Sequence, residues 1–386
     1  MSNRLLLTCT YSLILFLICQ RFHGNILFHW LRLIKIRIIK LNKYQRGDLM
    51  KKVSIKDIAN ITGVSTATVS RVINNNGRFS EETRLKVEQA IKDTGYQTNF
   101  NAKSLRINKS YSVGILVPDI TNSFFGNVVK EIEIELFNHD YSTIIASTGR
   151  NPQKEYNYID MLTSKMIDGL IIISGLNYSS KQESVHDIEV PFICIDRELN
   201  TSKSITLITS DHYQGGIEAA KAFAETGIKK PLIIVRDTNT TSTMERIEGF
   251  RHQLINEAIP FGDEQIFELH STDTITIRSQ IKTVLERNKG TDGIFAANDE
   301  MAALILKVAQ NMDIKVPEDL QIIGFDNSSI SKYTNPSLST IEQNTEEIAK
   351  TAVKYLLNEI DGSSPKERKK LIPVRLIKRG SLKKNN

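Results

Sequence analysis

Residues Ser54 to Gly77 read SIKDIANITGVSTATVSRVINNNG, and this stretch decides the fold of the front of the chain. It carries the signals of two short helices, because a serine stands where each can be capped, at Ser54 and Ser65, and Gly63 lies in the turn between them. A third helix is expected from Ser80 to Gly95. Apolar residues recur at helical spacing through all three segments and predict a small shared core. They are Ile55, Ile58, Ala59, Val64, Val69, Val72, Ile73, Leu85, Val87 and Ile91.

The second helix begins with the small residues Ser65-Thr66-Ala67-Thr68, which a helix built for a protein core does not need. Two helices joined by a glycine turn are typical of a helix-turn-helix, whose second helix enters the major groove of DNA N-terminus first. Small side chains let the backbone approach base edges, and Arg71, one turn later, can reach a guanine or a phosphate. The alternative is an ordinary helical hairpin with solvated polar faces. The candidate DNA contacts on this helix are Ser65, Thr66, Ala67, Ser70, Arg71 and Asn74.

The charge distribution supports a nucleic-acid partner for the front of the chain. The 386 residues have a formal net charge of +6, made of +7 over residues 1–49, +6 over residues 50–110 and −7 over residues 111–386. A basic small domain ahead of an acidic large one is typical of a protein whose front meets a polyanion. At this length, two or three domains are expected.

The segment from Ser54 to Gly77 resembles the headpiece of the lac repressor family of bacterial transcription regulators. The match continues to NFNAKSLRINKS, Asn99 to Ser110. The resemblance implies that this segment is a linker that folds as a hinge helix on operator DNA, with Leu105 as the leucine that enters the minor groove. It also implies a homodimer on a palindromic double-stranded operator. Thr98 departs from the family, which usually has proline there.

The first 49 residues leave several interpretations open. Leu5 to Cys19 is apolar, but its 15 residues are fewer than the roughly 20 that a bilayer span needs. It also lacks the small-residue cleavage site of a signal peptide. We hypothesise that Met50 is the true start, because the codons before it can encode a purine-rich ribosome-binding site. A membrane tether is expected only if residues 1–49 are translated. The three cysteines form no disulfide framework and favour a reducing compartment, hence a cytoplasmic protein associated with the nucleoid.

From Tyr111 onward, apolar strand-like runs alternate with amphipathic helical segments, which predicts two doubly wound parallel sheets with helices on both faces. The runs are SVGILVPD, YSTIIAST, DGLIIIS, VPFICID, PLIIVRD, DGIFAAND, LQIIGFD and LIPVRLI. No G-x-G-x-x-G or P-loop follows any of them, so no nucleotide cofactor is indicated. We divide the chain into an extension (1–49), a helix-turn-helix domain (50–98), a hinge linker (99–110) and an α/β core (111–386).

Polar and aromatic residues gather where the expected strands end, and fork-shaped arginine, acceptor carboxylates and phenylalanine faces together suit a polyol. The core resembles the sugar-binding domain of the lac repressor family and the periplasmic ribose-binding protein. The pattern is most similar to that of ribose operon repressors, which implies ribose as the effector. It falls on Asn122, Phe124, Phe125, Asp196, Arg197, Arg246, Asn298, Asp326 and Gln343.

Other functions compete with this interpretation. An exported sugar-binding protein would not carry a helix-turn-helix ahead of its core. An enzyme is not favoured, because His139, His212, His252 and His270 have no nucleophile or metal-ligand spacing beside them and are expected on the surface. We therefore expect no catalytic residue, no metal and no cofactor. A regulator that responds to another sugar, a purine or a phosphocarrier corepressor remains open, and the direction of the response is implied only by the resemblance.

Overall fold

A computed structural model gives the structure of the protein and describes residues 53–96, 109–173, 188–197, 205–236, 238, 240–269, 271, 273–363 and 367–384. These residues belong to two compact units, one within residues 1–100 and one within residues 101–386, and each is considered by itself. The N-terminal extension with the proposed start at Met50, and residues 99–108 of the linker, which include Leu105, lie outside the described residues.

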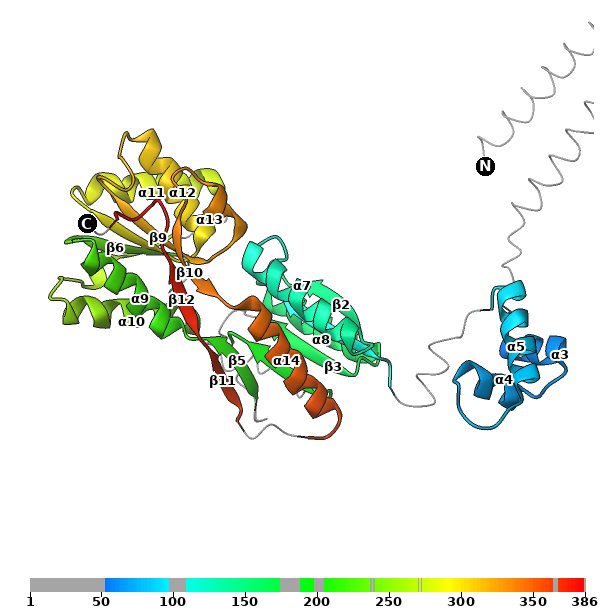
Figure 1. Ribbon diagram of the computed structural model, residues 1–386. Coiled ribbons are helices and arrows are strands. Elements are labelled where there is room, and N and C mark those ends of the chain that lie inside the picture. Colours follow the sequence, from blue (N-terminus) through cyan, green and yellow to red (C-terminus); the bar gives the residue numbers. More distant parts are fainter. Residues whose placement is uncertain are drawn as a thin grey trace, which may run out of the picture. The chain divides into compact units, whose positions relative to one another are not determined.

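The first unit contains the three short helices that the caps predicted (Figure 1). They are α3 (Ile55–Thr62), α4 (Thr66–Ile73) and α5 (Glu81–Thr94). Ser54 caps α3 in a reciprocal box: its hydroxyl accepts from the Asp57 amide, and the Asp57 carboxylate accepts from the Ser54 amide at 2.8 Å. Gly63 then ends α3 at a φ of 69°, a left-handed conformation that favours glycine. The sequence-based boundaries of this unit's helices are confirmed.

A small apolar cluster holds the three helices together, formed by Ile58, Ala59, Val69, Val72, Val87 and Ala90. Most of these were expected from the helical spacing. Leu85 was wrongly assigned to the core, because it is 59% exposed on α5. Ala90, which the prediction omitted, is buried instead, since it lies on the face of α5 that also carries Val87.

The second unit consists of two lobes, each built on a six-stranded sheet (Figure 1). The first lobe has the strand order β11-β5-β4-β3-β1-β2 and the second β12-β10-β9-β8-β6-β7. The strands of the first lobe are β1 (Ser112–Val117), β2 (Ser142–Ser147), β3 (Gly169–Ile173), β4 (Phe192–Ile195), β5 (Thr206–Ser210) and β11 (Lys369–Ile372). Those of the second are β6 (Pro231–Val235), β7 (Ile266–Glu268), β8 (Gly293–Ala296), β9 (Gln321–Asp326), β10 (Ser339–Gln343) and β12 (Val374–Ile377).

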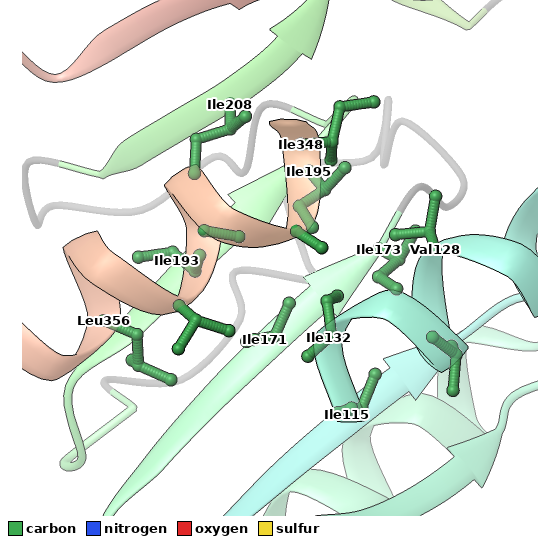
Figure 2. Close-up of a cluster of buried hydrophobic side chains, with 14 of the residues drawn as sticks. Ile115, Val128, Ile132, Ile171, Ile173, Ile193, Ile195, Ile208, Ile348 and Leu356 are labelled. Atoms are coloured by element: carbon green, nitrogen blue, oxygen red, sulfur yellow. The ribbon is translucent and has the colours of Figure 1, made fainter. Parts of the chain in front are cut away.

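Helices cover both faces of each sheet, as expected for doubly wound sheets. The helices of the first lobe are α7 (Ser123–Asn138), α8 (Pro152–Ser164) and α14 (Thr345–Ile360). Those of the second are α9 (His212–Glu225), α10 (Thr241–Asn256), α11 (Thr274–Arg287), α12 (Asp299–Asn311) and the short α13 (Ser329–Tyr333), with a 3-10 turn at Asp263–Gln265. Figure 2 shows Ile348 and Leu356 of α14 packing beside Val128 and Ile132 of α7 on the isoleucines of the first sheet. A late segment of the chain thus completes the core of the first lobe.

The chain crosses between the lobes three times: after β5, after β10, and between β11 and β12. The last crossing corrects a prediction. LIPVRLI was expected to be one strand, but Pro373 divides it into β11, parallel to β5, and β12, antiparallel to β10 in the other sheet. The strands β5, β7 and β10 were not predicted; β5 and β10 carry Thr, Ser, Glu or Gln among their apolar residues, and β7 is only three residues long.

Over the residues that the structure describes, no helix combines the length and the apolar character needed to cross a bilayer.

Candidate functional site

One face of α4 carries the residues predicted to meet DNA. Thr66, Ala67, Arg71 and Asn74 are exposed, together with the cap residue Ser65, whereas Ser70 is half-buried. Val69 and Val72 on the opposite face are buried in the headpiece core. The Ser65 hydroxyl accepts from the Thr68 amide at 3.1 Å, which fixes the start of the helix. Small side chains and one long cation therefore lie together on a face that no described residue covers.

Arg71 and Asn74 are each held by local contacts. The Asn74 side chain donates to the Ser70 carbonyl at 2.7 Å, so its amide is oriented at the C-terminus of α4. Gly77 has a φ of 92°, and a Cβ there would lie 3.3 Å from Cδ of Arg71. The glycine thus makes room for the stem of the arginine while its guanidinium extends into solvent.

The second candidate site is a cavity of about 360 Å³ between the two lobes, at the carboxyl ends of their strands. Seven of the nine predicted effector contacts line it: Asn122, Phe124, Phe125, Asp196, Arg246, Asn298 and Asp326. The two phenylalanines come from the first turn of α7, and their rings lie 5.5 Å apart in an edge-on arrangement. Apolar ring surface thus lies in the same cavity as hydrogen-bonding groups, as in most small-molecule sites.

Asn122 and Asn298 each act as the N-cap of a helix that begins at the cavity. The side-chain Oδ1 of Asn122 accepts from the backbone amide of Phe124 at 3.1 Å, and Oδ1 of Asn298 accepts from the backbone amide of Met301 at 2.9 Å. The Asn122 amide also donates to Glu300 across the lobes at 3.3 Å. Capping uses the side-chain oxygen of each asparagine, so only NH₂ hydrogens can serve a ligand, and one of those on Asn122 already donates to Glu300.

Asp196 directly follows β4, and one of its carboxylate oxygens accepts three hydrogen bonds. Its Oδ1 accepts from the Thr209 hydroxyl at 2.7 Å, the Ser210 amide at 3.1 Å and His212 Nε2 at 3.1 Å. Burial by itself would raise the pKa of Asp196, but its interactions with His212, Thr209 and Arg246 outweigh burial and lower the pKa. Asp196 is therefore a carboxylate whose Oδ2 has no hydrogen-bond donor among the described residues.

His212 was wrongly expected on the surface. It is 1% exposed, and its Nδ1 accepts from Arg246 Nε and Nη2, each at 3.3 Å. The sequence-based interpretation failed because His212 looks isolated along the chain. Its partners arrive from β4 and α10, two elements that the topology brings together.

Arg246 lies at the base of the cavity in α10. Its Nη1 donates to the Ala297 carbonyl at 2.6 Å, and its guanidinium carbon lies 3.6 Å from the centre of the Phe325 ring. Burial lowers the pKa of Arg246, while the carboxylates of Asp326 and Asp196 oppose this effect. The planar group is thus fixed in orientation by a ring below it and by acceptors at its edge.

Asp326 and Gln343 form a pair of which only the aspartate lines the cavity. Gln343 Nε2 donates to Asp326 Oδ1 at 2.7 Å, so the glutamine acts on the carboxylate and not on the cavity. Burial raises the pKa of Asp326 to about 8, although the nearby Arg246 lowers it. Asp326 can therefore be protonated at neutral pH and donate a hydrogen bond as well as accept one.

Arg197 also lies outside this cavity. It is 2% exposed, and its Nη1 donates to both oxygens of Glu155 in α8, at 2.8 and 2.9 Å. Arg197 and Glu155 form a buried ion pair within the first lobe. The position after Asp196 predicted a ligand contact, but the side chain of Arg197 turns toward the helix that covers the sheet.

Several residues that line the cavity were not predicted: Asp119, Arg150, Arg236, Thr240, Ser242, Thr243, Thr274 and Glu300. Arg236 directly follows β6, and Arg150 lies shortly after β2, so the strand-end rule could have found both. Hydrogen bonding to Thr121 lowers the pKa of Asp119 despite partial burial, and Arg150 and Arg236 lower it further. No cluster of three or more His, Cys, Asp or Glu suited to a metal occurs within the described ranges.

Comparisons with known proteins match both parts of the chain. Residues 54–99 match the model of the bacterial regulatory proteins of the lacI family, and residues 220–382 match a periplasmic binding protein-like domain. A sucrose operon repressor of Streptococcus mutans is 34% identical over 84% of this chain and 97% of its own length. The chain belongs to the lacI family of bacterial regulatory proteins. It is a DNA-binding transcription regulator of that family.

The chain is also similar to a second curated relative and to a solved structure. A ribose operon repressor of Halalkalibacterium halodurans is 30% identical over 86% of this chain and 97% of the relative. The structure of the lac repressor dimer bound to operator and the anti-inducer ONPF aligns with a TM-score of 0.77, covering 86% of this chain and 99% of that one. At 23% identity, this last likeness concerns the fold alone.

Proposed function

We propose that this lacI-family regulator is a transcriptional repressor that binds a palindromic operator as a homodimer and releases it when a small sugar enters the cavity between the lobes. The observation that carries the sugar assignment is the cavity itself. It combines the fixed guanidinium of Arg246, the carboxyl groups of Asp196 and Asp326, and the faces of Phe124 and Phe125. This set suits the hydroxyls and the C–H faces of a sugar ring. Such a repressor acts in the cytoplasm, on the nucleoid.

Ribose is the first candidate for the sugar. Seven of the nine residues of the ribose pattern line the cavity, and an eighth, Gln343, hydrogen-bonds to Asp326 within it. Arg197, the ninth, does not line the cavity, and its Nη1 donates to Glu155.

Sucrose is the second candidate, favoured by two observations. The sucrose operon repressor of Streptococcus mutans is the more similar relative, at 34% identity against 30% for the ribose operon repressor. In addition, Arg150, Arg236 and Thr274 extend the polar lining beyond the ribose set. A purine and a phosphocarrier corepressor are further alternatives.

Closure of the lobes is the proposed link from sugar to DNA. The cavity is lined from both lobes, so a sugar that contacts Phe124 on one side and Arg246 on the other favours the closed arrangement. The first core residues are fixed to the first lobe, because the amides of Ser110 and Tyr111 donate to Asp168 at 2.7 and 2.8 Å. Movement of this lobe is therefore transmitted to the linker before Ser110. By linkage, operator DNA weakens sugar binding by the same factor.

A pair of variants tests this proposal. Arg246→Ala is expected to bind operator normally and to ignore sugar, whereas Arg71→Ala is expected to lose operator affinity while its sugar binding stays normal. Operator affinity is measured by fluorescence anisotropy, and sugar binding by thermal unfolding of the full chain. A sugar at about 100 times its Kd adds roughly 2.7 kcal/mol to the free energy of unfolding. Loss of operator binding in Arg246→Ala at an unchanged unfolding temperature would contradict the assignment of the cavity.

A further inference from the structure

His212 lies between the two charged groups on which the proposed sugar site depends. Its ring is buried at the start of α9, where the chain has just left the first lobe. Nε2 lies 3.1 Å from Asp196 of the first lobe, and Nδ1 lies 3.3 Å from two nitrogens of Arg246 in the second. The ring centre is 5.7 Å from that of Phe325, on which the Arg246 guanidinium also rests. His212 thus joins the lobes through one residue of each.

The hydrogen bonds determine the form of the ring. An arginine side chain has only donors, so the Nδ1 atom that accepts hydrogen bonds from Arg246 must carry a lone pair and no proton. Asp196 is a carboxylate and accepts, so Nε2 must carry the proton. His212 is therefore neutral, with its hydrogen on Nε2. Protonation of Nδ1 would replace an acceptor with a donor and set a second cation against the guanidinium.

This arrangement decides which donors of Arg246 reach the cavity. A guanidinium has five N–H groups. Nε and one hydrogen of Nη2 are directed to His212, and one hydrogen of Nη1 to the Ala297 carbonyl. The two remaining N–H groups, one on each terminal nitrogen, form a fork that two neighbouring hydroxyls of a sugar can accept.

The backbone holds His212 and Arg246 at this distance. Helices α9 and α10 cross so closely that a Cβ on Gly216 would lie 2.2 Å from the Arg246 carbonyl oxygen. Likewise, a Cβ on Gly249 would lie 2.0 Å from the carbonyl oxygen of Tyr213. Only glycine fits at either position, so the packing of the two helices sets the spacing between the histidine and the arginine.

From this geometry we infer that neutral His212 is a positioning residue of the sugar site: it fixes the orientation of the Arg246 fork by accepting from Nε and Nη2 of the guanidinium. The inference rests on the proposed function. The charged groups that hydrogen-bond to the ring are Asp196, which follows β4, and Arg246 of α10.

Three variants of the full chain separate positioning from structure. His212→Phe keeps a ring beside Phe325 and removes both hydrogen bonds, so ribose and sucrose are expected to bind about tenfold or more weakly, as for loss of a hydrogen bond to a charged group. His212→Asn supplies one donor and one acceptor and is expected to restore most of the affinity. His139→Phe, at a site 51% exposed at the end of α7, is the matched control and is expected to bind like the unmodified protein.

Rescue by His212→Asn is the readout that a merely structural role would not give. Equal sugar affinity in His212→Phe and the unmodified protein would overturn the inference, and so would a His212→Asn variant that binds sugar no better than His212→Phe.

A nuclear magnetic resonance experiment tests the tautomer of His212 directly and needs no sugar. Nitrogen-15 signals of the histidine rings, assigned with His212→Asn, are expected to report the neutral Nε2–H tautomer of His212 at pH 7. An imidazolium or an Nδ1–H tautomer would overturn the inference. If neither ribose nor sucrose raises the unfolding temperature of the unmodified protein, the proposed function fails for these sugars, while the tautomer still tests His212.

Discussion

Asp326 is predicted to make the core less stable as the pH rises. Its pKa is raised from 3.8 to about 8 by burial, so between these values the folded protein holds a proton that the unfolded chain has released. The free energy of unfolding therefore falls with increasing pH across this window. One pKa unit corresponds to about 1.4 kcal/mol, so this carboxyl lowers stability by roughly 3 to 4 kcal/mol between pH 5 and pH 8.

Asp326→Asn removes the titration and leaves an amide of similar shape beside Gln343. Urea unfolding of the full chain at intervals from pH 5 to pH 8 should give two curves that diverge, with the Asn variant increasingly more stable at high pH. Below pH 6 the free energy of unfolding should also fall with rising pH by the same smaller amount in both proteins, since burial raises the pKa of Asp299 to about 6 in each. Asp160→Asn, on the exposed face of α8, should follow the unmodified protein. Parallel curves for Asp326→Asn and the unmodified protein would refute the reasoning.

Three further variants test other parts of the structure. Gly249→Ala places a Cβ against the Tyr213 carbonyl and should lower the free energy of unfolding by roughly 1 to 3 kcal/mol; an unchanged urea midpoint would contradict the close helix crossing. Arg197→Met leaves Glu155 buried without its cation and should lower the free energy of unfolding by about 3 to 5 kcal/mol. Adding Glu155→Leu should recover most of this loss, so a double variant whose two effects simply add would count against the ion pair. Arg71→Ala should weaken binding to the specific operator by roughly 1 to 3 kcal/mol. If affinity for random DNA falls equally and the salt dependence of the binding constant becomes smaller, Arg71 contacts a phosphate and not a base.

The headpiece was predictable because its signals are local. Ser54, Gly63 and Ser65 act through hydrogen bonds and backbone angles within a few residues, and the spacing of Ile58, Val69 and Val72 reports a core made within one short stretch. The alternation of strands and helices gave the class of the core for the same reason.

The remainder depends on contacts between distant segments. His212 contacts Asp196 and Arg246 only because the chain passes from one lobe into the other after β5. Arg197 lies outside the cavity because its side chain pairs with Glu155 of α8. Pro373 breaks LIPVRLI between two sheets, which no local pattern of apolar residues indicates. The position of polar residues at the predicted strand ends was enough to locate the cavity. The direction in which each side chain points could be seen only in the tertiary structure.

The central claim, that a sugar in the cavity controls operator binding, is tested most directly by one titration. Operator DNA selected from random sequences by the full chain is labelled, and its affinity is measured by fluorescence anisotropy without sugar and with ribose or sucrose. The account predicts a palindromic operator whose affinity falls by roughly 5- to 150-fold in the presence of one of these sugars, the usual range of allosteric coupling. An operator affinity unchanged by either sugar, when one of them raises the unfolding temperature of the same protein, would contradict the account.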